Sequence, residues 1–130
     1  MERLLYQSKA SPNVTGKDVF KIIEASSRNN LARCVTGFLL HDGDRFLQLL
    51  EGPPLEVEGL VAHIERDERH SDMEVLSRTS ASEHWFPEWS MKQLISFGSE
   101  PAIVQIRRAL EGKTGGDALL AEVESFLARG

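Results

Sequence analysis

The sequence contains a single cysteine, Cys34, and no long apolar run. One cysteine cannot form an internal disulfide, and there is no Cys-x-x-Cys spacing for zinc or redox chemistry. No segment approaches the roughly 18 apolar residues of a membrane span, and the N-terminus MERLLYQSKA lacks the apolar stretch of a signal peptide. His63 and His70 have no carboxylate cluster at a recognised spacing, so no metal site is predicted. We therefore expect a cytoplasmic protein.

Excess positive charge is also missing. The net charge is −5 and the isoelectric point is about 5.4. General nucleic-acid binding needs a basic surface, and so does attraction to anionic membranes. Both classes of partner are therefore disfavoured. The length of 130 residues indicates one domain with one sizeable core.

Hydrophobic patterns divide the first part of the chain into short elements. Asp42-Gly43 between two apolar runs is a strong hairpin signal. Gly52-Pro53-Pro54 ends a strand and favours a helix start at Pro54. The pattern predicts strands over 2–8, 34–41, 44–51, 72–80 and 89–95, and helices over 17–31 and 54–66.

This order, βαββαββ, predicts an α+β fold of the ferredoxin-like type with both helices on one face of the sheet. The right-handed crossover is expected to place the first strand parallel to a neighbour. The first and third strands would form the central pair, so Tyr6 and Gln48 would lie on adjacent strands. Their spacing alone does not decide whether they face the same side.

The pattern changes after Phe97-Gly98. Residues 100–111 and 117–129 have the apolar periodicity of two further helices. They are too short to form a separate domain. We expect a main domain over 1–97 and a helical extension over 98–130, which packs on the open face of the sheet or forms a dimer contact.

The central residue of the stretch FLQLLEG, Gln48, is a polar group in an otherwise apolar strand. A buried amide is unfavourable by about 1–3 kcal/mol unless it is hydrogen-bonded. In one interpretation, Gln48 satisfies a neighbouring backbone or hydroxyl group. Alternatively, it bridges Tyr6 and a ligand, because an amide can donate and accept at once.

Three further segments admit both a structural and a binding interpretation. The first helix becomes polar at Ser26, Asn29 and Asn30, as at a frayed end or along the polar edge of a pocket. The charged loop 67–70 is either a solvated connection or a place where Arg69 meets phosphate. Trp89 and Met91 share one face of the predicted last strand, where aromatic and methionine side chains are more often core residues.

Together these residues resemble the BLUF family of blue-light sensors that use FAD. The resemblance runs from about Arg3 to Leu94 and rests on five motifs in order: RLLYQS, SSRNNLARCVTGFLL, DRFLQLLEG, HIERDERHS and WSM. It implies the ferredoxin-like fold with a fifth strand and a flavin between the two helices, against the sheet.

The resemblance also implies roles for individual residues. Tyr6 would be the photoactive tyrosine, Gln48 the glutamine between it and the flavin, and Asn30 a hydrogen-bond partner of the ring's polar edge. Trp89 and Met91 would relay the signal. The remaining expected flavin contacts are Ile22 and Ile64, which flank the ring, and Ser26, Asn29, Asp67, Arg69 and His70.

The implied mechanism is a switch without enzymatic turnover. Light drives proton-coupled electron transfer from Tyr6 to the flavin, after which Gln48 is left rotated or as its imidic tautomer and absorption shifts to the red. The signal would pass to an oligomer, a dimer or larger, or to a separate protein partner.

Two alternatives come from other classes of protein. An acylphosphatase-like hydrolase would need an arginine in a glycine-containing loop after the first strand, and Ser8–Pro12 contains neither residue. A dimeric small-ligand regulatory module would use the C-terminal helices as its interface.

Overall fold

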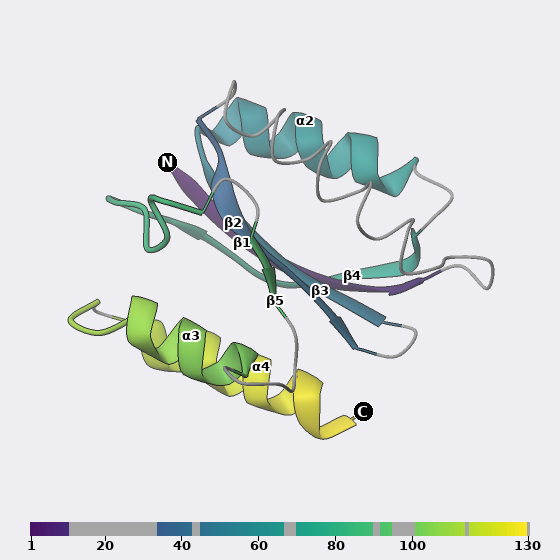
Figure 1. Cartoon of the computed structure of the whole chain (residues 1–130). Helices are drawn as coiled ribbons and strands as arrows, with labels where there is room; N and C mark the ends of the chain where they lie inside the picture. Colours follow the sequence, from purple (N-terminus) through teal and green to yellow (C-terminus); the bar gives the residue numbers. More distant parts are fainter. Residues whose placement is uncertain are drawn as a thin grey trace.

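The structure is a computed structural model that describes residues 1–10, 34–42, 45–66, 70–89, 92–94, 101–113 and 115–129. The predicted helix over 17–31 lies outside these ranges. The elements, labelled as in Figure 1, are β1 (Glu2–Ala10), β2 (Thr36–Asp42), β3 (Arg45–Gly52), α2 (Pro54–Glu65), β4 (His70–Ser80), β5 (Lys92–Leu94), α3 (Ala102–Ala109) and α4 (Gly116–Arg129).

One five-stranded sheet has the order β4-β1-β3-β2-β5. The central pairing of β1 with β3 is confirmed, and so is the β2–β3 hairpin, in which Asp42 is opposite Arg45. The expectation of a parallel neighbour for β1 is wrong, because β1 is antiparallel to both β3 and β4. The hairpin places β3 between β1 and β2 in the sheet. The strand that runs parallel to β1 is therefore β2, which is not its direct neighbour. The parallel pair is β2 with β5.

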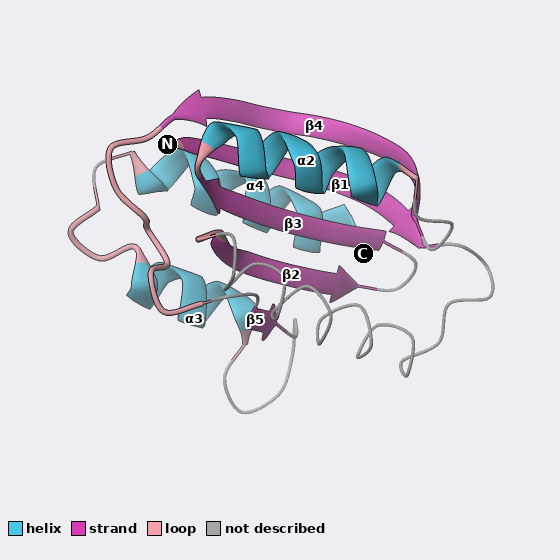
Figure 2. Ribbon diagram, turned by 90° about the horizontal axis from the view of Figure 1, so that it is seen from above, coloured by secondary structure: helices cyan, strands magenta, loops and turns pink. Residues whose placement is uncertain are grey.

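The described helices cover both faces of the sheet. α2 lies across β4, β1 and β3 on one face (Figure 2), whereas α3 and α4 lie on the other (Figure 1). We call these the α2 face and the α3–α4 face. Because side chains alternate along a strand, each face has its own apolar cluster. The C-terminal helices therefore pack on the open face of the sheet, as the first of the two expected arrangements required.

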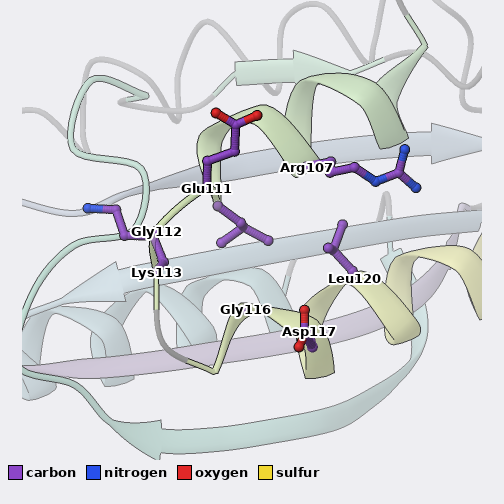
Figure 3. Close-up of a pocket in the computed structure, with 8 residues that line it drawn as sticks. Arg107, Glu111, Gly112, Lys113, Gly116, Asp117 and Leu120 are labelled. Atoms are coloured by element: carbon purple, nitrogen blue, oxygen red, sulfur yellow. The ribbon is translucent and has the colours of Figure 1, made fainter.

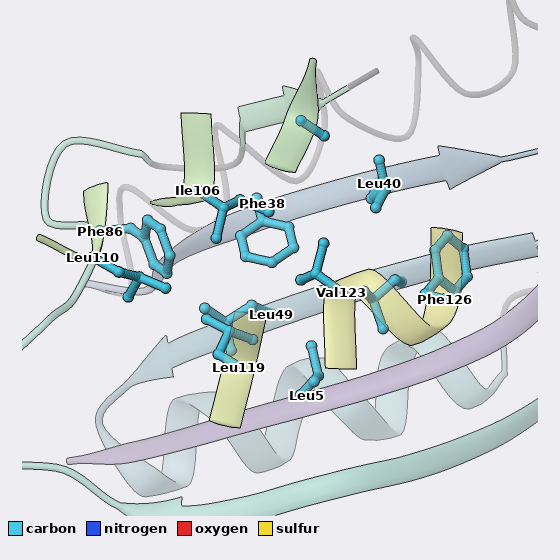
Figure 4. Packing of buried hydrophobic residues seen from close by; sticks show 12 residues of the cluster. Leu5, Phe38, Leu40, Leu49, Phe86, Ile106, Leu110, Leu119, Val123 and Phe126 are labelled. Atoms are coloured by element: carbon cyan, nitrogen blue, oxygen red, sulfur yellow. The ribbon is translucent and has the colours of Figure 1, made fainter. Parts of the chain in front are cut away.

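The cluster on the α3–α4 face joins the sheet to both C-terminal helices. Phe38 and Leu49 of the sheet meet Ile106 of α3 and Val123 of α4, and all four side chains are buried (Figure 4). Each fully buried side chain of this size contributes about 1.5–3 kcal/mol of transfer free energy. This burial explains why two short helices hold a fixed place against the sheet.

Gly37 allows β2 to approach β3 closely. Its φ is 154°, and a Cβ added there would lie 1.8 Å from the carbonyl oxygen of Leu49. Its N–H donates to the carbonyl oxygen of Trp89 at 2.7 Å. Gly37 therefore fixes both the β2–β3 spacing and the position of the chain before β5.

Of the predicted last strand over 89–95, the described strand β5 covers Lys92–Leu94. Trp89 lies before it. The N–H of Trp89 donates to the carbonyl oxygen of Phe86 at 3.1 Å, which closes a turn with Pro87 at its second position, a place that proline favours. Trp89 thus ends a turn instead of starting a strand.

A buried carboxylate attaches residues 83–86 to the sheet. Glu51 of β3 is fully buried. Its Oε2 accepts from Arg3 Nε and from the Trp85 N–H, both at 3.0 Å, and its Oε1 accepts from the Phe86 N–H at 2.7 Å and from Thr36 Oγ1 at 3.1 Å. We call Arg3, Thr36 and Glu51, with the Trp85 and Phe86 amides, the Glu51 clamp.

We expect Gly37→Ala to lower the free energy of unfolding by at least about 2 kcal/mol, because the new methyl group overlaps a backbone oxygen. The control is Gly112→Ala, where φ is 76° and nothing lies within 4 Å of the added Cβ. Backbone strain alone should lower the free energy there by about 1 kcal/mol. Urea denaturation measures both values; equal losses would contradict the close approach.

We expect Glu51→Ala to lower the free energy of unfolding by about 3–5 kcal/mol, because it leaves the Arg3 charge without its buried partner. The matched control is Glu124→Ala, which removes an exposed contact with Arg107 at 3.8 Å. That change should have an effect below about 1 kcal/mol. The comparison uses the same denaturation assay, and similar small losses in both variants would argue against a tightly held carboxylate.

Candidate functional site

Tyr6 and Gln48 form the polar centre of the α2 face. They are Cα partners in the β1–β3 ladder, so their side chains leave the sheet on the same side. Tyr6 is fully buried and Gln48 is 3% exposed. The Tyr6 hydroxyl donates a hydrogen bond to Gln48 Oε1. The structure thus answers the question that the spacing left open.

The alternation within FLQLLEG explains how an apolar strand carries this amide. Phe46, Gln48 and Leu50 belong to the α2 face, whereas Leu47 and Leu49 belong to the cluster under α3 and α4. A strand covered on both faces has apolar residues at most positions. Gln48 is the position on the α2 face where that pattern is broken.

Among the described residues, the side chains around the pair are mainly apolar. The buried hydrophobic residues of this cluster, besides Tyr6, are Leu4, Val35, Leu39, Phe46, Leu50, Val57 and Leu60. In such surroundings a phenol–amide hydrogen bond stabilises two groups whose unpaired burial would be unfavourable by about 1–3 kcal/mol each. Because the Gln48 carbonyl oxygen faces the Tyr6 hydroxyl, the NH₂ group of the amide points away from Tyr6. A rotation of the amide by half a turn would exchange the positions of its oxygen and its NH₂ group.

Several predicted site residues fall outside the described ranges: Ile22, Ser26, Asn29, Asn30, Asp67, Arg69 and Met91. Ile64 lies in α2 and His70 begins β4, where it is the Cα partner of Ala10. The structure therefore brings Tyr6 and Gln48 into contact, and it gives the backbone positions of Ile64 and His70.

Trp89 lies on the opposite face of the sheet from Tyr6 and Gln48. It packs against the cluster under α3 and α4. Its ring stacks on Phe86 with centroids 4.8 Å apart and meets Phe38 edge-on at 6.4 Å. In this arrangement Trp89 contacts the C-terminal layer of the molecule.

The Glu51 clamp was missed in the sequence. Its signal was a glutamate at the end of FLQLLEG, next to the last leucine of an apolar run. Arg3 lies in the motif RLLYQS and Glu51 in the motif DRFLQLLEG, 48 positions apart. The partners of Glu51 come from β1, β2 and the chain after β4, so spacing along β3 does not reveal them.

A separate cavity of about 380 Å³ lies at the turn between α3 and α4 (Figure 3). Its charged lining mixes both signs: Arg107, Lys113, Glu111 and Asp117. This cavity belongs to the helical layer and is distant from Tyr6 and Gln48 in the fold. Its open, mixed-charge lining gives no specific chemistry.

The described residues include no group of three or more potential metal ligands, and none of their helices is long and apolar enough to cross a membrane. The pKa of Arg78 is raised, first by its hydrogen bond to Glu2. Because arginine is charged at every physiological pH, this shift creates no pH-dependent switch.

Comparison with known proteins assigns residues 1–92 to the family model BLUF, sensors of blue light using FAD. A photoactivated adenylate cyclase subunit beta of Euglena gracilis is 34% identical over 89 residues, which is 68% of this chain and 10% of the cyclase. The blue light- and temperature-regulated antirepressor BluF of Escherichia coli K12 is 36% identical over 67 residues, 52% of this chain and 17% of the antirepressor. This chain thus spans a small part of these relatives.

Solved structures give the same assignment. The dark-state structure of the BLUF protein BlrB has a TM-score of 0.74 at 27% identity, with 98% of this chain and 95% of that chain covered. Klebsiella pneumoniae BlrP1, in a complex with manganese and cyclic diGMP, has a TM-score of 0.83 at 27% identity, with 98% and 32% covered. The resemblance seen in the sequence and the ferredoxin-like fold are both confirmed. The family is one of light sensors, which agrees with the expectation of a switch without enzymatic turnover. The chain belongs to the BLUF family of blue-light sensors.

Proposed function

We propose that this protein binds FAD on the α2 face and senses blue light through Tyr6 and Gln48. The observation that carries the proposal is the buried hydrogen bond from the Tyr6 hydroxyl to Gln48 Oε1, between register partners of the two central strands. The family description, sensors of blue light using FAD, supports the choice of cofactor.

The residues on this face fit a flavin ring. Its apolar body suits the leucine and valine side chains around the pair, and its polar edge suits a carboxamide that can donate and accept. When bound, the flavin would supply blue-light absorption and an oxidising excited state. The residues that would hold it with Gln48 are Ile22, Ser26, Asn29, Asn30, Ile64, Asp67, Arg69 and His70.

The proposed switch uses the Tyr6–Gln48 bond as a proton path. In the dark, the proton stays on the Tyr6 hydroxyl oxygen and points at Gln48 Oε1. When an electron passes from the phenol to the excited flavin, the phenol proton would cross to Gln48 Oε1. Recombination would return the electron and one proton to Tyr6, so that no net redox change would remain. Gln48 would then be left rotated or as its imidic tautomer, with a donor available to a flavin carbonyl, and absorption would shift to the red.

The output of the switch is proposed to lie outside the flavin-binding part. We assign that part to residues 1–97 and the output contact to the helical extension 98–130, acting through an oligomer or a separate partner. Trp89, which contacts Phe38 and Phe86, and Met91 are the proposed relay. A cytoplasmic location stays a prediction from the sequence. Neither alternative function gains support from a specific contact.

We expect Tyr6→Phe to keep a bound, yellow flavin and to lose the light-induced red shift, because the ring remains and the proton donor is gone. Tyr6 is the single tyrosine of the sequence, so no other phenol can replace it. Loss of one buried hydrogen bond should lower the free energy of unfolding by about 1 kcal/mol. Absorption spectra before and after blue light test this; a normal red shift would contradict the role of Tyr6.

We expect Gln48→Leu to fold and to lose the red shift, because leucine fills the space and neither donates nor accepts. The matched control is Gln7→Leu on β1, where the side chain is half-buried and donates to Glu74 at the surface at 3.0 Å. That variant should keep the full red shift. The proposal fails if Gln48→Leu retains the shift, or if Gln7→Leu abolishes it equally.

A further inference from the structure

We propose that Glu51, together with Arg3, is a positioning residue that couples the light-sensing strands to the C-terminal helices. This inference rests on the proposed function. It assigns a route by which a change at Tyr6 and Gln48 reaches the opposite face of the sheet.

The route begins in the β1–β3 ladder. Arg3 is the Cα partner of Glu51, and Tyr6 is the Cα partner of Gln48, three rungs further along the same ladder. Three rungs correspond to about 10 Å along the strands. Because three is an odd number, the two pairs leave the sheet on opposite faces. The same two strands therefore carry the switch on one face and the clamp on the other.

The clamp transfers the position of these strands to residues 83–86. Glu51 accepts the N–H groups of Trp85 and Phe86 at 3.0 and 2.7 Å. Arg3 donates to the carbonyl oxygen of Glu83 at 2.7 Å, and its guanidinium lies 3.4 Å from the centre of the Trp85 ring. The Arg3–Glu51 ion pair thus holds three backbone groups of this segment: the Glu83 carbonyl and the N–H groups of Trp85 and Phe86.

Residues 83–86 in turn contact α3, α4 and the turn between them. The Phe86 ring is buried beside Ile106 and Leu110 (Figure 4). Trp85 lines a cavity of about 170 Å³ with Leu119 of α4. These contacts connect the clamp to both C-terminal helices.

The chemistry of the clamp suits transmission better than apolar packing does. Apolar burial is non-directional, whereas a buried carboxylate loses charge-assisted hydrogen bonds when its donors separate. Glu51 has no exposed surface through which water could replace those donors. A displacement of β3 must therefore move the 83–86 backbone with it.

The test uses the full chain loaded with FAD and follows amide hydrogen exchange over residues 101–129 in darkness and under blue light. Wild type should show the red shift and a light-dependent exchange change in these helices. Glu51→Gln should keep the red shift, because the Tyr6–Gln48 face is unchanged. Its light-minus-dark exchange difference should fall at least about fivefold.

A second variant and a matched control complete the experiment. Arg3→Lys keeps the positive charge but loses the planar contact with Trp85, and it should reduce the exchange difference in the same direction. Arg78→Lys alters another arginine beside β1, paired with Glu2 and Glu58 and outside the clamp. That control should leave both the red shift and the exchange difference unchanged.

The outcomes separate the two proposals. A full exchange difference in either clamp variant with a normal red shift would overturn the coupling while leaving the proposed function intact. Loss of the red shift in Glu51→Gln, with native dark-state exchange, would also overturn it, because the clamp would then belong to the photochemistry. A wild-type protein without a red shift would contradict the proposed function and the coupling with it.

Discussion

The antiparallel register between β1 and β3 is the constraint on which the rest of the structure depends. It sets Tyr6 opposite Gln48 and Arg3 opposite Glu51. A slip of one residue would turn every side chain of a strand to the other face. The phenol would then leave the α2 face and the arginine would leave the carboxylate, so both polar pairs would be lost at once.

The Tyr6–Gln48 and Arg3–Glu51 pairs differ in charge and in how strongly they are held. The Tyr6–Gln48 pair is neutral, and its described neighbours are mainly apolar side chains. Its hydrogen bond can therefore be exchanged for another at a small cost in free energy. The Arg3–Glu51 pair is ionic and held by additional backbone donors, so breaking it is far less favourable. One pair is suited to switch, and the other is suited to hold the surrounding chain in place.

Local signals in the sequence were enough for much of the fold. Asp42-Gly43 predicted the hairpin and Pro54 predicted the start of α2, because turn and helix-start preferences act within a few residues. The direction of the neighbours of β1 was wrong because it depends on strand order, a long-range property. The predicted start of the last strand at residue 89 was wrong because the Phe86–Trp89 turn competes with it.

The site was predictable only in part. Gln48 stood out as an amide in an apolar strand, whereas Glu51 at the strand end resembled an ordinary exposed residue. Its partner Arg3 is 48 positions away in sequence, and two other donors are backbone groups that carry no residue signature. The relay role of Trp89 was implied by the resemblance and stays a prediction. The structure adds the contacts of its ring with Phe86 and Phe38.

The central claim is that the Tyr6 phenol and the Gln48 carboxamide act as one proton-coupled unit beside a flavin. The most direct measurement is the light-minus-dark infrared spectrum of the flavin-loaded protein with and without ring-deuterated tyrosine. Since Tyr6 is the single tyrosine, every band that moves with the label belongs to it. We expect a shifted phenol C–O band that decays together with the red-shifted absorption. A full red shift with no label-sensitive band would contradict the account.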